Sequence, residues 1–277
     1  MASNISDPSQ WNELTEEEHG WTKALRDAQF YADAEFAKTI SDFQYAQHAI
    51  IAKDQVEKGL KRIRRLQEFK KAHGIADNGS ITIEKAKEII KKMDEKAPGF
   101  IMSFGREEKD GEVHGRHVFS MRYDTFLPAN FDESDINNFF VGFYLWLEAC
   151  QPDLDSVRKG MAIVCECEGL GWKNFSLDLE KRAAKLYQDA YPIRIKEMSV
   201  LHPNRLMKVF YALCKPFLSK RVKEVFNMNV NSEDIKGRYS PELLPATLGG
   251  TQDQLDMFDK MIESLQHRLE NEASFKL

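Results

Sequence analysis

Hydrophobic positions in the first third of the chain recur at the spacing of an α-helix. The earliest such series is Trp21, Leu25, Ala28, Ala32 and Phe36. Thr15 and Glu18 stand just before it with the spacing of a capping box, which predicts the start of a helix. Two more apolar stripes predict helices over 56–74 and 83–97. Residues 1–97 are therefore expected to form an N-terminal helical lobe.

Beyond residue 97 the pattern changes to short apolar runs that alternate with longer amphipathic or apolar segments. The short runs predict strands at 117–123, 161–167 and 195–201, and the longer segments predict helices at 136–149, at 177–190 and from residue 203 onward. Strands that alternate with helices are typical of crossover connections and a parallel sheet. The sequence therefore predicts an α/β fold class for residues 98–277, with a mostly parallel sheet flanked by helices.

Composition narrows the class of protein. With 277 residues, of which 42% are hydrophobic and 30% charged, the chain is typical of a globular protein with a substantial core. The apolar run from Phe139 to Leu147 is about half of the ~20 residues that a membrane-spanning helix needs, and the acidic segment up to Glu18 does not have the pattern of a secretory signal. The 4 cysteines lack paired spacing, which favours reduced thiols. We expect a cytoplasmic protein without disulfides.

The charge is unevenly distributed. A formal net charge of −5 argues against general nucleic-acid binding. Between Ile193 and Val225, however, basic residues dominate and the acidic residues are limited to Glu197 and Glu224. Such a block is suited to an anionic membrane surface, but taken alone it is more typical of the solvated face of amphipathic helices.

Signatures of catalysis and metal binding are largely missing. The sequence has no nucleophile elbow, no Gly-x-x-x-x-Gly-Lys loop and no His-Glu-x-x-His pair. Gly169 and Gly171 follow a predicted strand, but Asn174 occupies the third glycine position of a dinucleotide fingerprint. Cys165 and Cys167 would face the same side of a strand, without the further ligands of a tetrahedral site. The sequence predicts no catalytic residue, no catalytic cofactor and no metal site, and an α/β enzyme with a nucleotide cofactor is the weakest alternative.

Large apolar side chains are abundant, with 18 Phe, 8 Tyr, 10 Met and 4 Trp. Many occupy positions that the predicted elements turn inward: Phe119, Met121, Tyr123, Phe140, Tyr144, Cys165, Met198, Met207, Phe210, Leu213 and Phe217. Residues of these types form either a solid core or the lining of an apolar cavity. The residues by themselves leave both interpretations open.

A series of motifs in the C-terminal half favours the cavity. The motifs are Glu166-Cys167-Glu168-Gly169, Tyr191-Pro192, Lys215-Pro216-Phe217-Leu218, Leu244-Pro245 and Leu248-Gly249-Gly250-Thr251. In order and approximate spacing, the region from Gly115 to Thr251 resembles the CRAL-TRIO lipid-binding family, and it looks most like the retinaldehyde-binding and tocopherol-transfer branch. The resemblance implies a non-enzymatic carrier in which a mixed sheet forms the floor of a hydrophobic cavity and a mobile gate helix, at about 203–225, closes over one lipid.

The resemblance also implies the ligand and the partners. A bound retinoid, with retinaldehyde first, is expected ahead of tocopherol and carotenoid, and the inward-facing side chains named above are the candidate ligand-binding residues. Arg194, Lys196 and Arg221 match basic positions that bind phosphoinositide headgroups in the tocopherol-transfer branch. Ile193 and Val225 replace polar residues of the phosphatidylinositol-transfer branch, so phosphatidylinositol is not expected as cargo. We therefore expect a cytoplasmic carrier with peripheral membrane association and an unidentified protein acceptor.

Two apolar stripes sharpen these expectations. In the gate helix, Leu206, Phe210, Leu213 and Phe217 have the spacing of one helix face, which we expect to cap the ligand. Near the C-terminus, a second stripe consists of Leu255, Phe258, Ile262, Leu265 and Leu269. It either packs on the protein's own core or forms a dimer seam. An exposed seam would favour the alternative function, a lipid-sensing module that recruits a protein partner.

Overall fold

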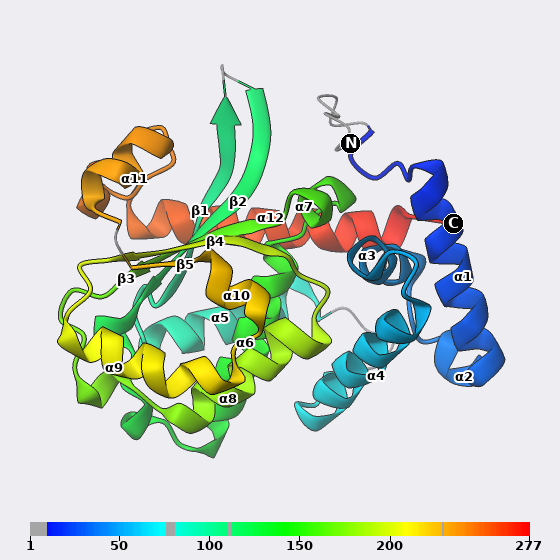
Figure 1. Cartoon of the computed structure of the whole chain (residues 1–277), viewed down its shortest axis with the longest axis horizontal. Coiled ribbons are helices and arrows are strands. Elements are labelled where there is room, and N and C mark those ends of the chain that lie inside the picture. Colours follow the sequence, from blue (N-terminus) through cyan, green and yellow to red (C-terminus); the bar gives the residue numbers. More distant parts are fainter. Residues whose placement is uncertain (1–9, 76–80, 110–111, 229) are drawn as a thin grey trace.

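The computed structural model describes residues 10–75, 81–109, 112–228 and 230–277 (Figure 1). The chain begins with helices α1 (Glu16–Ala32), α2 (Ala34–Ala37), α3 (Asp42–Ala52), α4 (Val56–Ala72) and α5 (Ile83–Lys96). The capping box predicted for α1 is present: the Glu18 backbone N–H donates to the Thr15 hydroxyl at 3.3 Å, and the Thr15 N–H donates to the Glu18 carboxylate at 3.1 Å. The helical character of the N-terminal part is thus confirmed.

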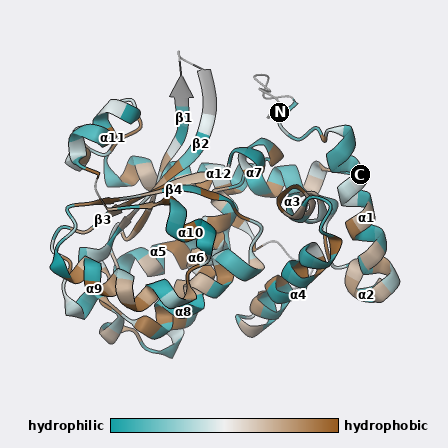
Figure 2. Ribbon diagram, in the orientation of Figure 1, coloured by the Kyte–Doolittle hydropathy of each residue, from teal (hydrophilic) through white to brown (hydrophobic). Residues whose placement is uncertain are grey.

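A five-stranded sheet follows, in the order β1 (Ile101–Lys109), β2 (Glu112–Arg122), β3 (Met161–Glu166), β4 (Ile195–Leu201) and β5 (Phe226–Asn227). Strands β1 and β2 are antiparallel, and the remaining pairs are parallel. The mostly parallel sheet predicted from the alternation of strands and helices is therefore confirmed. Figure 2 shows β3 and β4 as hydrophobic along most of their length, as expected of strands that helices cover on both faces.

The helices of the α/β part are α6 (Glu133–Ala149), α7 (Leu154–Lys159), α8 (Leu177–Lys185), α9 (Arg205–Cys214), α10 (Lys220–Val225), α11 (Ser232–Arg238) and α12 (Gln254–Ser274). The short helical turns are η2 (Tyr123–Thr125), η3 (Pro128–Asn130), η4 (Trp172–Asn174), the π-helical η5 (Leu186–Ala190), η6 (Lys215–Phe217) and η7 (Ala246–Leu248). In Figure 1, α6, α8, α9 and α10 lie on one side of the sheet and α11 lies on the other. Among the described residues, no helix combines the length and apolar character needed to cross a membrane.

The two faces of the sheet pack into different cores. Met161, Ile163 and Cys165 of β3 belong to a large cluster with α6, α8 and α9, whereas the alternate residues Ala162 and Val164 belong to a second cluster with β1, α11 and the start of α12. Side chains of a strand point alternately to the two faces, so a single strand contributes to both cores.

The N-terminal helices and the α/β part share core and polar contacts. Helix α5 packs against α6 and α12, and α12 also contacts α3. The buried Arg268 guanidinium of α12 lies 3.0 Å from the Glu148 carboxylate of α6 and 2.7 Å from that of Glu272. Pairing of this kind compensates for the cost of burying a charge. The division at residue 97 stays a prediction, since α5 contributes to the same core as the sheet.

The Gly-Gly-Thr motif forms a close turn before α12. A Cβ atom on Gly250 would lie 2.0 Å from the backbone oxygen of Leu244, so only glycine fits. The Gly250 N–H donates to Pro245 O at 3.0 Å, and the Thr251 N–H donates to Pro241 O at 2.9 Å. This motif therefore has a structural role on the sheet face opposite α9.

Candidate functional site

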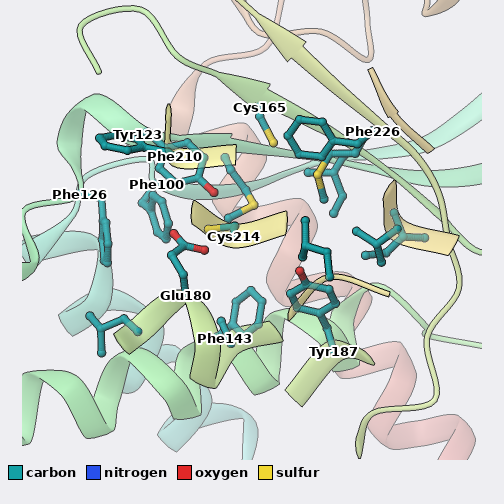
Figure 3. Close-up of a pocket in the computed structure, with 18 of the residues that line it drawn as sticks. Phe100, Tyr123, Phe126, Phe143, Cys165, Glu180, Tyr187, Phe210, Cys214 and Phe226 are labelled. Atoms are coloured by element: carbon teal, nitrogen blue, oxygen red, sulfur yellow. The ribbon is translucent and has the colours of Figure 1, made fainter. Parts of the chain in front are cut away.

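A cavity lies between the sheet and helices α6, α8, α9 and α10 (Figure 3). It is narrow: its volume of ≈ 100 Å³ is smaller than the roughly 300–1,000 Å³ of ligand pockets. The lining includes Phe100, Phe126, Phe139, Phe143, Trp146, Ile163, Leu170, Phe175, Leu218 and Phe226. Because these side chains are apolar and largely aromatic, the cavity is suited to a hydrophobic molecule.

Part of the predicted site lines this cavity: Met121, Tyr123, Cys165, Met198, Met207 and Phe210. The sheet register explains the strand residues. Met121 of β2 is the register partner of Cys165 in β3, and Met198 of β4 is the partner of Ile163. Residues that are neighbours across parallel strands present their side chains on the same face.

Three other predicted residues, all buried, lie outside the cavity. Phe119 is covered by Trp146 of α6, whose ring meets it edge to face at 5.2 Å. On α6 itself, Phe140 packs 5.5 Å from the ring of His73, and Tyr144 packs 6.1 Å from the ring of Phe69. Both therefore face α4.

The periodicity of α6 did not show which of its sides faces the cavity. From Phe139 to Ala149 every residue of this helix is buried, so polar positions do not mark an outer face. The side chains that line the cavity are Phe139, Phe143, Trp146 and Leu147.

The predicted gate helix differs from the structure in two respects. Helix α9 ends at Cys214, and after η6 a second helix, α10, begins at Lys220; Pro216 has no backbone N–H to continue the first helix. The cavity-facing side chains of α9 are Met207, Phe210, Tyr211 and Cys214. The predicted face was thus partly wrong. Leu213 is 42% exposed and Phe217 lies beyond the end of α9, so neither lines the cavity.

The segment formed by α9, η6 and α10, here called the gate segment, is held over the cavity mainly by ring contacts. The ring of Phe210 stacks on that of Phe175 at 4.2 Å, and the ring of Tyr211 stacks on that of Phe226 at 4.5 Å. Contacts between aromatic rings contribute about 0.5–1.5 kcal/mol each beyond the area they bury.

Side-chain amides fasten the gate segment at two points. Asn204 Nδ2, at the N-cap of α9, donates to Leu170 O at 2.7 Å. At the other end, Gln188 Nε2 donates to Phe217 O at 3.3 Å, and the Ser219 N–H donates to Gln188 Oε1 at 2.6 Å. These bonds and ring contacts lie outside the hydrogen-bond ladder that joins β1 to β4.

Glu180 of α8 is the acidic residue among the cavity-lining side chains. Burial raises the pKa of its carboxyl group from 4.5 to about 7. Burial also raises the pKa of the Cys214 thiol to about 12 and that of Cys165 well above its usual value. Neutral thiols are poor nucleophiles, so the cysteines are part of an apolar lining.

Four basic side chains from three elements form what we call the basic cluster: Arg62 (α4), Arg194 and Lys196 (start of β4) and Arg221 (α10). In each case burial lowers the pKa, and the charge of Arg221 contributes to the lowered pKa of the other three. Nη1 of Arg62 and Nε of Arg194 are buried without a hydrogen-bond partner in the described part of the chain. Mutually repelling cations with free donors are suited to binding an anion.

The glycine-rich turn is closed by its own residues. The Gly171 N–H donates to Asn174 Oδ1 at 2.8 Å, and Asn174 Nδ2 donates to the backbone oxygens of Asp124 and Phe126, both at 2.9 Å. These contacts fill the position where a dinucleotide would need free N–H groups. Within the residues that the structure describes, no group of three or more His, Cys, Asp or Glu side chains is arranged to hold a metal ion.

The sequence interpretation missed Glu180, Tyr187 and Arg62. Glu180, Ala183 and Tyr187 line the cavity at i, i+3 and i+7 along α8 and η5, so an acidic residue on an apolar stripe was the available signal. For Arg62 the sequence shows only a basic helix face, because its proximity to β4 and α10 depends on tertiary packing.

Comparisons with known proteins agree with this geometry. The model of the CRAL/TRIO domain family matches residues 109–250. The alpha-tocopherol transfer protein-like proteins of Homo sapiens and Mus musculus are 27% identical over 149 residues, which are 52% of this chain and 43% of theirs. The matched region is thus less than half the length of these relatives.

Two further matches are more limited in what they show. Tyrosine-protein phosphatase non-receptor type 9 of Homo sapiens is 29% identical over 108 residues, which are 39% of this chain and 18% of that protein. The solved structure of Sfh5 covers 94% of this chain and 98% of its own, with a TM-score of 0.60 and 11% identity. The latter match shows the fold, from the N-terminal helices through the sheet.

Proposed function

Because the chain belongs to the CRAL/TRIO family, whose members bind lipids, we propose that it is a carrier that encloses one bulky hydrophobic ligand and exchanges it with membranes. The apolar cavity beneath the gate segment is the observation that carries this proposal. Burial of ~400 Å² of apolar ligand surface at about 25 cal/mol per Å² contributes on the order of 10 kcal/mol, which the cost of immobilising the ligand reduces. A bilayer solvates the same ligand about equally well, so exchange requires the gate segment to open at a membrane.

A retinoid is the first ligand to test, followed by tocopherol and carotenoids. The relatives named alpha-tocopherol transfer protein-like support a bulky isoprenoid. The aromatic lining supports a flat, rigid molecule, since Phe100, Phe143 and Phe175 present rings to the same space. Transport of a lipid requires no catalytic group. In this proposal the protein resides in the cytoplasm and contacts membranes transiently.

The surface around the gate segment supports a membrane contact. Val209 and Leu213 of α9, and Trp172, whose ring meets that of Phe210, are large apolar side chains that remain exposed. The basic cluster lies at the other end of the gate segment, where it includes Arg221 of α10. Apolar side chains that enter the interface and cations that meet anionic headgroups, phosphoinositides among them, would together hold the mouth of the cavity against a bilayer.

The ligand can be identified from the purified protein. After isolation from the native source, an organic extract should contain near-stoichiometric hydrophobic ligand, and the absorption spectrum should show a retinoid or carotenoid band if the ligand is one of these. A protein that is empty as isolated and takes up no hydrophobic molecule from a lipid extract would contradict the carrier function.

The membrane contact is tested by transfer kinetics. Arg194→Ala combined with Arg221→Ala should slow ligand transfer to vesicles that contain phosphatidylinositol 4,5-bisphosphate by roughly tenfold or more, since each basic residue near an anionic surface contributes about 1 kcal/mol. Binding of ligand in solution should not change. The matched control, Lys87→Ala with Lys91→Ala, removes the same charge from the exposed face of α5. Equal transfer rates for both double variants would exclude the basic cluster from transfer.

The alternative of a partner-recruiting module finds less support. Of the C-terminal stripe, Ile262 and Leu265 are buried in the protein's own main core and Phe258 packs against it, whereas Leu255 is exposed. Helix α12 thus uses the central part of this stripe to pack on α6 and β1. A dimer seam would need the same side chains.

A further inference from the structure

Three of the polar side chains in the cavity lining come from α8 and the turns η2 and η5. They are Glu180 of α8, Tyr123 of η2 and Tyr187 of η5, here called the polar triad. Figure 3 shows their oxygen atoms directed into the cavity. The charge of Glu180 raises the pKa of both tyrosines, after the larger effect of burial, which indicates that the three groups lie near one another.

The polar groups of the triad form no hydrogen bonds with other residues of the described chain. Within the described part of the chain, the Glu180 carboxyl group and the two tyrosine hydroxyls form no hydrogen bond or ion pair with another residue. The other titratable groups that line the cavity are Cys165, Cys214 and Tyr211, and no Lys, Arg or His is among the lining residues. These partly buried groups therefore face the cavity without a partner in the described part of the chain. Unpaired burial of a polar group costs roughly 1–3 kcal/mol.

The hydrogen-bonding properties of the polar triad restrict which ligand groups can pair with it. The carboxyl group of Glu180 offers acceptor oxygens in both protonation states and one donor only when protonated, whereas a tyrosine hydroxyl donates one hydrogen bond and accepts others. A hydrocarbon would satisfy none of the three. An aldehyde or an ether only accepts hydrogen bonds, so it leaves an acceptor oxygen of Glu180 unpaired whether or not the carboxyl group carries a proton, and a second carboxylate would repel the ionised form. A hydroxyl group donates to Glu180 and accepts from Tyr123 or Tyr187 at the same time.

We propose that the enclosed lipid carries a free hydroxyl group, which Glu180 binds as acceptor and the hydroxyls of Tyr123 and Tyr187 bind as donors. This inference rests on the proposed carrier function and specifies its substrate class. Among retinoids it selects the alcohol rather than retinaldehyde, and tocopherol and hydroxylated carotenoids satisfy it as well. Glu180 then acts as a specificity-determining residue, since burial of an unpaired carboxylate penalises every ligand that lacks the donor.

The first test is selection from a mixture. The protein and its Glu180→Leu variant are incubated with a total lipid extract of the native source, separated from free lipid and analysed by mass spectrometry. The wild-type protein should retain lipids with a free hydroxyl, and the variant should lose that selection while retaining hydrophobic lipid. If the wild-type protein retains lipids without a hydroxyl, or lipids whose only donor is an amine, the inference is overturned.

The second test uses matched probes on two skeletons. Quenching of protein fluorescence, to which the cavity-lining Trp146 contributes, measures binding of retinol against retinyl methyl ether and of α-tocopherol against its methyl ether. A methyl ether lacks the hydroxyl proton that would be donated to the buried polar groups, and such a loss reduces affinity by roughly tenfold or more. The wild-type protein should therefore bind at least one of the two alcohols more tightly than its ether by that factor. In Glu180→Leu, the ratio of alcohol affinity to ether affinity should fall close to one, because the ether binds more tightly. Glu180→Gln, which keeps an acceptor oxygen, should retain part of the preference.

The two proposals fail in different ways. If alcohol and ether bind with equal affinity to the wild-type protein and to Glu180→Leu, the carrier function stands and the role of the polar triad is overturned. If neither the probes nor any lipid of the extract binds, the carrier function fails, and the inference fails with it. A change in the ratio of alcohol affinity to ether affinity is interpreted only for variants that show a cooperative thermal unfolding transition. If Glu180→Leu does not fold, Glu180→Gln provides the test.

Discussion

The two faces of the central sheet are built from the same strands but pack in different ways. On one face, Ile163 and Cys165 meet large aromatic side chains that leave a cavity between them. On the other, Ala162 and Val164 pack in a cluster with Phe104 and Leu244. The difference shows that hydrophobic composition does not separate a binding site from a core, because both faces are apolar. What distinguishes the cavity face is the size of its side chains and the polar triad among them.

A groove at the edge of the second face sharpens this contrast. It is lined in part by Arg122, Asp124, Glu166 and His202. The His202 ring lies 2.9 Å from the Glu166 carboxylate and 3.2 Å from the Ser232 hydroxyl, so these three side chains are hydrogen-bonded to one another. Within the described residues, the unpaired polar atoms of this groove include Asp124 Oδ1 and Gln252 Oε1, each on a side chain whose other polar atom is bonded within the protein.

Substitutions on the two sides of β3 should give the largest contrast. Ala162→Leu adds volume to the packed face and should lower the free energy of unfolding by about 3 kcal/mol, the upper end of typical overpacking costs. Cys165→Leu adds volume to the cavity face, where space is available, and should cost about 1 kcal/mol or less while weakening ligand binding. Urea unfolding and fluorescence quenching measure the two effects. Equal destabilisation by both substitutions would indicate that the cavity face is as solid as the other.

The pH dependence of stability should reveal the buried carboxyl group. Burial raises the pKa of Glu180 from 4.5 to about 7, so between these values the folded protein holds a proton that the unfolded chain has released. Stability of the ligand-free protein should therefore fall as pH rises from about 4.5 to 7 and stay level above, by up to about 3 kcal/mol.

Glu180→Gln isolates that contribution, because all other titrating groups are common to both proteins. The groups that face Glu180 are Tyr123, Tyr187, Cys165 and Cys214, whose pKa values are all raised by burial and which therefore stay neutral in this range. Relative to the wild-type protein, the variant should be most favoured at pH 8 and least at pH 4.5. A difference in unfolding free energy that is constant with pH would show that Glu180 is ordinarily solvated.

The exposed apolar rim should affect membrane binding without affecting stability. Leu213→Ser removes an apolar side chain of the gate segment that is 42% exposed, and we expect vesicle binding to weaken by up to about tenfold, or 1.4 kcal/mol. Leu255→Ser is the matched control, since this leucine is 67% exposed at the start of α12. Vesicle flotation compares the two. If Leu255→Ser has the larger effect, the membrane meets the other side of the molecule.

The smallest effect is expected at the fastening of the gate segment. Gln188→Ala removes the side-chain bonds to Phe217 and Ser219, and each such bond contributes about 1 kcal/mol. Release of ligand to vesicles should accelerate a few-fold, with little change in the unfolding midpoint. Gln266→Ala, which removes a side-chain bond on the exposed surface of α12, should not change the release rate. A slower release from Gln188→Ala would mean that these bonds favour the open state.

Local patterns predicted the elements but not which of their sides would meet. The capping box at Thr15, the helices at 56–74 and 83–97 and the three main strands are local features, and the structure contains them. Helix α3 was missed because nearly all of its residues are buried, so it shows no polar face. Strand β1 was missed because Ile101–Phe104 is buried throughout and does not alternate.

The same limit applies to the candidate site. Strand parity and register placed Met121, Cys165 and Met198 on the cavity side, because neighbouring strands share a period of two. Phe140 and Tyr144 were assigned to the wrong side of α6, since an all-apolar helix can turn any side to the sheet. Rotation of such a helix is decided by packing against α4 and α5, which no local pattern encodes.

By itself, then, the amino-acid sequence determined the kinds of secondary structure, the mostly parallel sheet, the basic block and, through ordered motifs, the family. Only the tertiary structure decided that one apolar face encloses a cavity while the other is packed, that Arg62 joins Arg194 and Arg221, and that Glu180 stands opposite two tyrosines without a partner. Local periodicity depends on neighbours a few residues apart. Cavities, charge clusters and unpaired groups depend on elements that are distant in sequence and adjacent only after folding.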